Sequence, residues 1–94
     1  MVRVGIYTFE LYLSSSSSLK DKRKILKSLK DRLRSKHNVS IAEVDGQELW
    51  QRSTLAVVSV SNSEASLQAS FHKIHNEIDK LLPGEVVAEQ MEFL

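Results

Sequence analysis

Hydrophobic residues recur along this chain with two different periods, and the changes of period predict where strands and helices lie. Over Val2–Leu13, hydrophobic and polar residues alternate, as in a strand that turns one face to a core. Over Leu19–Lys36, leucines recur every three or four residues, which places them on one stripe of a helix. Ser18 precedes this helix as an N-cap, and Asp21 favours the positive end of its dipole. The chain therefore starts with a strand and a well-marked helix.

The rest of the chain repeats this alternation. A turn is predicted at Asp45–Gln51, between two strands, and the Asp-Gly pair at its start suits the positive dihedral angles of a tight hairpin. Pro83-Gly84 ends a second run of apolar residues at helical spacing. The further predicted elements are strands at Val39–Val44 and Ser53–Ser61, a helix from Ser63 to about Leu82 and a strand at Glu85–Phe93.

The order strand, helix, strand, strand, helix, strand fits the ferredoxin-like sandwich, an α+β fold. Right-handed crossovers then place both helices on one face of a four-stranded antiparallel sheet. A chain of 94 residues suffices for one such domain with one core. The other face of the sheet stays uncovered and largely apolar, so we expect a homo-oligomer, most simply a dimer. The first strand would contribute to this face Val4, Ile6, Thr8, Glu10 and Tyr12.

Five consecutive serines, Ser14–Ser18, join the first strand to the first helix. Serine side chains compete for main-chain hydrogen bonds and favour loops over helices, so we expect a flexible connection. A phosphate-binding loop is the alternative, but such loops depend on glycine for close approach of the main chain, and this segment has none.

The first predicted helix is strongly basic. Leu19–Lys36 holds nine Lys and Arg residues and two Asp, a net charge of +7, whereas the rest of the chain has a net charge of −6. Like charges four residues apart destabilise an isolated helix slightly. One interpretation is that these cations bind RNA phosphates. The alternative is that they form a solvated helix face, partly paired with acidic residues elsewhere in the chain. The candidate nucleic-acid-binding residues are Lys20, Arg23, Lys24, Lys27, Lys30 and Arg34.

An RNA-binding sheet needs exposed aromatic residues on its central strands, where bases can stack. The predicted third strand, Ser53–Ser61, has none, and Tyr12 alone on the first strand is not enough. We therefore expect any RNA contact to lie on the helix.

Composition excludes several classes of protein. The chain has no cysteine, so neither a disulfide framework nor a thiolate metal site is possible. No apolar run approaches the roughly 20 residues that span a bilayer, and the charged residues Arg3 and Glu10 interrupt the N-terminal apolar pattern, unlike in a signal peptide. We expect a cytoplasmic protein without a cofactor.

Trp50 and Gln51 lie at the exit of the predicted hairpin. An exposed indole there would be a candidate anchor for a partner, because tryptophan is enriched among residues that dominate interface energies. The alternative, which the usual burial of tryptophan favours, is that Trp50 closes one end of the core.

Two groups of residues have the right chemistry for a metal ion but lack a full ligand set. Carboxylates around the hairpin could take Mg²⁺, although solvated turn residues are commoner. A row along one flank of the second helix could hold a transition metal, although no other ligand segment is marked. No nucleophile, base and orienting group can be assigned, so we expect neither a metal site nor an enzyme. The two groups are Glu43, Asp45 and Glu48, and His72, His75 and Asp79.

Three segments, Leu19–Arg23, Asn38–Val44 and Trp50-Gln51, resemble a known family, the YlxP-like bacterial proteins. The resemblance covers nearly the whole chain and implies the ferredoxin-like fold, but no established reaction. Genes of this family often lie beside those of a translation initiation factor and a ribosome-maturation factor, which implies, by association, a role near the ribosome. Together with the basic helix, this favours RNA or a ribosomal subunit as partner. Family members carry proline, glycine and charged residues where this chain has Ser14–Ser18.

Overall fold

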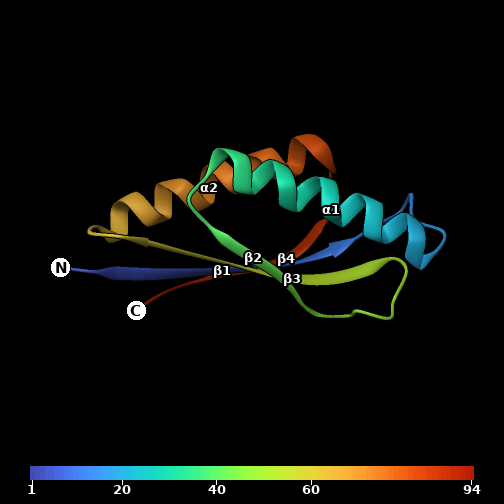
Figure 1. Ribbon diagram of the computed structural model, residues 1–94, viewed down its shortest axis with the longest axis horizontal. Helices are drawn as coiled ribbons and strands as arrows, with labels where there is room; N and C mark the ends of the chain where they lie inside the picture. Colours follow the sequence, from blue (N-terminus) through green and yellow to red (C-terminus); the bar gives the residue numbers. More distant parts are fainter.

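Two helices cover one face of a four-stranded sheet in the computed structural model, which describes residues 1–94 (Figure 1). Neighbouring strands are antiparallel and lie in the order β2-β3-β1-β4. This is the ferredoxin-like topology, as the order of elements predicts. The elements are β1 (Arg3–Tyr12), α1 (Leu19–Lys36), β2 (Ser40–Asp45), β3 (Arg52–Ser61), α2 (Glu64–Leu81) and β4 (Val86–Phe93).

The core lies between the sheet and the helices. Alternate residues of β1 face it, and Tyr7, Phe9 and Leu11 are at most 1% exposed. Burial of such side chains is the main favourable contribution to folding. The core residues that the helices contribute are Leu26, Leu29, Leu33, Phe71, Ile74 and Ile78. The predicted alternation of β1 and the apolar stripes of both helices are confirmed.

Serine side chains begin both helices. Asp21 N donates a hydrogen bond of 3.0 Å to Ser18 Oγ, and Ser66 N donates one of 3.3 Å to Ser63 Oγ. Each cap satisfies one of the main-chain amides that have no partner within the helix. Neither helix has the length and apolar composition needed to cross a membrane.

The serine run is bound to its surroundings more closely than the expected flexible connection. Ser16 is 1% exposed and its Oγ donates to Ser18 O. Ser17 donates to Asp21 Oδ2 through both N and Oγ, at 3.1 and 2.7 Å. Ser14 likewise donates to the Glu85 carboxylate. The run therefore serves as an extended helix cap rather than as a free linker.

The face of the sheet opposite the helices is uncovered (Figure 1), and we call it the open face. The register pairs Val4 with Val60 and Ile6 with Val58, so these four side chains share one end of the face. Val58 is 36% and Val60 54% exposed. The other residues that β1 and β3 place on this face are Thr8, Glu10, Tyr12, Arg52, Thr54 and Ala56.

The connection between β2 and β3 is a six-residue loop, residues 46–51, which agrees with the turn predicted at Asp45–Gln51. Gly46 has a φ of +76°, a value that favours glycine, and a register shift between Glu43 and Asp45 precedes it. The loop extends beyond the sheet on the side of the open face (Figure 1).

The two termini lie at the opposite end of the molecule from this loop (Figure 1). Leu94 N donates to Val4 O at 2.8 Å, which holds the end of the chain beside the start of β1. The long axis of the molecule is 45 Å, so the loop and the termini are widely separated.

Candidate functional site

Six of the nine basic residues of α1 lie on the side of the helix that faces away from the core, as the spacing predicts. We call Lys20, Arg23, Lys24, Lys27, Lys30 and Arg34 the basic ridge. All are exposed except Lys30, which is half-buried. Leucines on the opposite stripe bury α1 against the sheet and α2, and this contact leaves the basic ridge on the outer surface.

Two cations of the basic ridge already have partners in the structure. Lys27 Nζ forms an exposed ion pair of 2.8 Å with Asp31, and it holds the pKa of that carboxyl below its usual value. Arg34 Nη2 donates a hydrogen bond of 2.9 Å to Ile41 O, in the edge strand β2. The four cations with neither an ion pair nor a side-chain hydrogen bond are Lys20, Arg23, Lys24 and Lys30.

A seventh cation of α1, Lys22, points the other way. Its side chain is 2% exposed, and its Nζ lies 2.7 Å from Glu43 Oε2 on β2. The same nitrogen donates hydrogen bonds of 2.6 Å to Gly46 O and 3.5 Å to Gln47 O. Glu43 Oε2 also accepts a hydrogen bond of 2.7 Å from Ser53. An ammonium has three protons, and each has an oxygen acceptor here.

Lys22 therefore ties three separate segments together: α1, the edge strand β2 and the start of the loop at residues 46–51. Sequence reasoning counted it only as part of the helix charge. The available signal was its position, because Lys22 falls in register with Leu26, Leu29 and Leu33 on the buried stripe. A charge on that stripe requires a buried partner, and Glu43 is the nearest carboxylate that the fold supplies.

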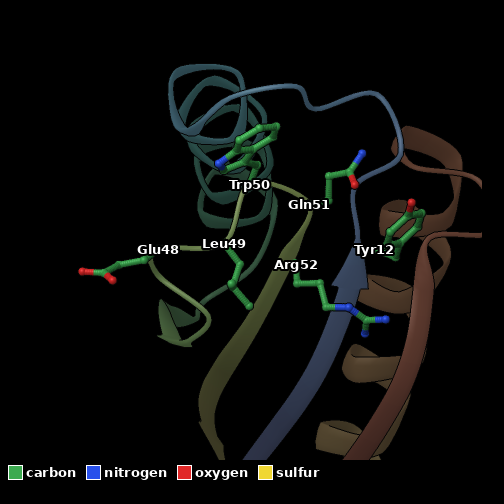
Figure 2. Close-up of a pocket in the computed structure, with 6 residues that line it drawn as sticks. All are labelled: Tyr12, Glu48, Leu49, Trp50, Gln51 and Arg52. Atoms are coloured by element: carbon green, nitrogen blue, oxygen red, sulfur yellow. The ribbon is translucent and has the colours of Figure 1, made fainter.

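The loop that Lys22 holds forms one side of a shallow hollow of about 420 Å³. Trp50 is 57% exposed and Leu49 52%, so the interpretation of Trp50 as a core residue is wrong. The indole lies outside the core because the loop runs past the end of the sheet before Arg52 begins β3. Figure 2 shows Glu48 directed away from the hollow and Arg52 directed toward Tyr12. The residues that line the hollow, which we call the Trp50 hollow, are Tyr12, Glu48, Leu49, Trp50, Gln51 and Arg52.

Arg52 orders the floor of the Trp50 hollow. Its guanidinium carbon lies 5.8 Å from the centre of the Tyr12 ring, and its Nη1 forms an ion pair of 2.7 Å with Glu10. Tyr12 and Arg52 are directly opposite in the register of β1 and β3. The Trp50 hollow is therefore continuous with the open face.

Neither group of possible metal ligands comes together as a site, and no cluster of three His, Asp or Glu side chains has suitable geometry. Glu43 is bound to Lys22, and Asp45 Oδ1 accepts from Gly46 N. Asp79 Oδ1 accepts from Gly84 N, while His75 faces Glu89 at 2.9 Å. Glu43, Asp45, His75 and Asp79 thus have protein partners.

A buried tyrosine lies under the second helix. Tyr7 Oη is 3.2 Å from His75 Nδ1. Burial, followed by the nearby negative charge and hydrogen bond of Glu89, raises the pKa of Tyr7 far above its usual value. The phenol therefore stays protonated and serves as a structural hydrogen-bonding group.

The fold defines the class of the protein as a ferredoxin-like α+β sandwich, here with a basic helix on one side and an uncovered sheet on the other. Within this class, the chain belongs to the family described as "Protein of unknown function (DUF503)", whose profile matches residues 4–91. It is 33% identical over 76 residues to the uncharacterized protein YlxP of Bacillus subtilis (strain 168), which spans 81% of this chain and 83% of that protein. The expected resemblance to YlxP-like proteins is confirmed.

Solved structures of low sequence identity share the fold. A dimeric ferredoxin-like protein of unknown function from Bacteroides fragilis NCTC 9343 is 15% identical, with a TM-score of 0.58 over 98% of this chain and 94% of that one. A second dimeric ferredoxin-like protein of unknown function, from Thermobifida fusca, is 14% identical, with a TM-score of 0.51 over 97% and 90%. The de novo designed protein Foldit4 is 12% identical, with a TM-score of 0.60 over 100% and 97%.

Proposed function

We propose that this protein is a non-catalytic accessory module that contacts the phosphates of RNA, or of a ribosomal particle, through the basic ridge of α1. The observation that carries the proposal is that Lys20, Arg23, Lys24 and Lys30 have no ion-pair partner within the chain. An acidic remainder is present, yet it does not neutralise them.

The dimensions of the ridge agree with this proposal. Lys20 and Lys30 are ten residues apart, which corresponds to about 15 Å along a helix axis. Nucleic acid carries a phosphate charge every few Å along its axis, so a row of this length can meet several of them. Contacts of this kind give affinity without sequence preference.

The proposal is tested by measuring the binding of the purified protein to structured RNA and to ribosomal subunits over a salt series. Three or four phosphate contacts predict a loss of affinity of about 20-fold or more between 50 and 200 mM salt. The variant Arg23→Glu/Lys24→Glu removes two unpaired cations, and we expect it to abolish measurable binding.

A matched control places the same change of charge on the other helix. Lys73 and Lys80 are exposed on α2, so Lys73→Glu/Lys80→Glu alters the net charge equally and leaves the basic ridge intact. Equal loss in both variants, or no binding of the unmodified protein at low salt, contradicts the proposal.

Self-association through the open face is a second candidate, and the exposure of Val58 and Val60 favours it. Two proteins of the same fold are dimeric. A contiguous patch of exposed apolar side chains on a sheet face commonly marks an interaction site. Sedimentation of the untagged protein over a range of concentrations tests this candidate independently of RNA.

A further inference from the structure

We infer that two copies of this chain pair with their open faces opposed and their strands running in opposite directions, so that the residue 46–51 loop of each copy packs on the termini end of the other. The inference rests on the proposed self-association and adds to it a specific arrangement. It assigns the Trp50 hollow to a second copy of the same chain.

The charge of the open face favours a second copy over nucleic acid. Near the loop end, Glu10 and Arg52 neutralise each other in an ion pair of 2.7 Å. The termini end adds one carboxylate, Glu92, opposite Ile6. An antiparallel pair keeps the two Glu92 side chains at opposite ends, and the face offers no free cation to phosphate. The basic ridges would repel each other, but the pairing keeps them on the two outer surfaces.

The size of the open face is sufficient for a modest dimer. Strands of 10, 6, 10 and 8 residues, at about 3.3 Å per residue and about 4.8 Å between strands, cover about 550 Å² in each copy. The total of about 1,100 Å² lies just above the lower limit for a specific interface. A larger interface needs additional contacts from the two loops. The position of each loop against the partner copy therefore decides whether the dimer is stable.

The loop restricts how two sheets can meet. When two opposed sheets pack with their strands aligned and are related by a twofold axis, the strands run either parallel or antiparallel. The 46–51 loop extends past the sheet on the side of the open face (Figure 1). In a parallel pair both loops lie at the same end and hold the two sheets apart there. In an antiparallel pair each loop lies beyond the termini end of its partner, and the sheets can approach.

The two ends of the open face match in distance and in chemistry. Val2 and Tyr12 each lie about five residues, or about 17 Å, from the middle of β1. The loop end presents Leu49 and Trp50. The termini end has a hollow of about 360 Å³ lined by Met1, Val2, Val60, Ser61 and Asn62. An antiparallel pair therefore brings the exposed indole of one copy over the exposed valines of the other, twice.

The absence of cysteine allows this arrangement to be tested by mixing. One preparation carries Leu49→Cys and the other Val2→Cys, and a short bis-maleimide is added to each alone and to both together. We expect a covalent dimer only in the mixture. Covalent dimers from Leu49→Cys alone would show a parallel pair and overturn the arrangement while leaving self-association intact.

Sedimentation distinguishes the other outcomes. An unmodified protein that stays monomeric at high concentration overturns both the arrangement and the proposed self-association. Val58→Lys should convert the dimer to monomer, and Trp50→Ala should weaken dimerisation at least about tenfold. The control Leu81→Lys changes an exposed apolar residue at the end of α2, away from the open face, and should leave dimerisation unchanged. Dimerisation that survives Val58→Lys contradicts the arrangement.

Discussion

The Nζ atom of Lys22 lies 2.7 Å from Oε2 of Glu43, and this pair joins the buried side of α1 to the edge strand β2. The Lys22 side chain is 2% exposed and the Glu43 side chain 17%. Water therefore has little access to the ammonium, which depends on its protein partners for stabilisation.

Removal of one partner of this pair should cost more stability than removal of both. Lys22→Met leaves the Glu43 carboxylate without its cation, and Glu43→Leu leaves a buried ammonium, so each should lower the free energy of unfolding by about 3–5 kcal/mol. The double variant Lys22→Met/Glu43→Leu leaves neither charge behind. Chemical denaturation of the four proteins measures the coupling. Additive losses would show that the two groups do not depend on each other.

The serine cap should make stability depend on pH through Asp21. Hydrogen bonds from the Ser17 side chain and main chain lower the pKa of Asp21 below its ordinary value of 3.8. Its ionised form is therefore favoured by folding, and this stabilisation is present above pH 3.8 and lost as pH falls through the lowered pKa. We expect Ser17→Ala to raise the pKa of Asp21 in an NMR titration.

The same variant should unfold more easily than the unmodified protein near neutral pH, and the difference should disappear in strong acid. Ser15→Ala is the matched control, because Ser15 is exposed and belongs to the same run of serines. A loss of stability from Ser17→Ala that persists unchanged in strong acid would assign the effect to something other than Asp21.

A close contact in the core should make Gly5 sensitive to a single added methyl group. A Cβ atom at Gly5 would lie 2.8 Å from Cε2 of Phe71. The Phe71 ring stacks between Tyr7, at 5.7 Å, and Phe93, at 6.0 Å, so it has little room to move. Gly5→Ala should therefore lower the free energy of unfolding by about 1–3 kcal/mol.

A smaller residue at position 71 should relieve part of that loss. Phe71→Leu is destabilising by itself because it leaves space in the core. In the Gly5→Ala background the cost of Phe71→Leu should be smaller, and thermal melts of the single and double variants measure this difference. An equal cost in both backgrounds would show that the ring shifts without strain.

The order of elements, the α1 boundaries and both N-caps could be predicted from the sequence, because each depends on contacts between near neighbours in the chain. The alternation in β1 and the leucine spacing in α1 are local patterns with a single structural solution. Ser18 and Ser63 are caps for the same reason: their partners lie three residues away.

The candidate sites depend on contacts between distant residues, and these could not be predicted in the same way. Lys22 and Glu43 lie on different elements, and only the packing of α1 over β2 brings them together. The usual burial of tryptophan favours a core position for Trp50 over that of a partner anchor, but the length and path of the loop leave it 57% exposed. The spacing predicts which residues form the basic ridge. It does not predict that Lys27 pairs with Asp31 or that Arg34 binds the Ile41 carbonyl.

Both ends of the chain lie together at the end of the sheet where Leu94 is hydrogen-bonded to Val4. In the inferred pair, this end receives the loop of the other copy. A purification tag fused to either terminus would occupy the same space and would favour the monomer. The assembly state should therefore be measured after tag removal, and a tagged preparation that sediments as a monomer would report on the tag.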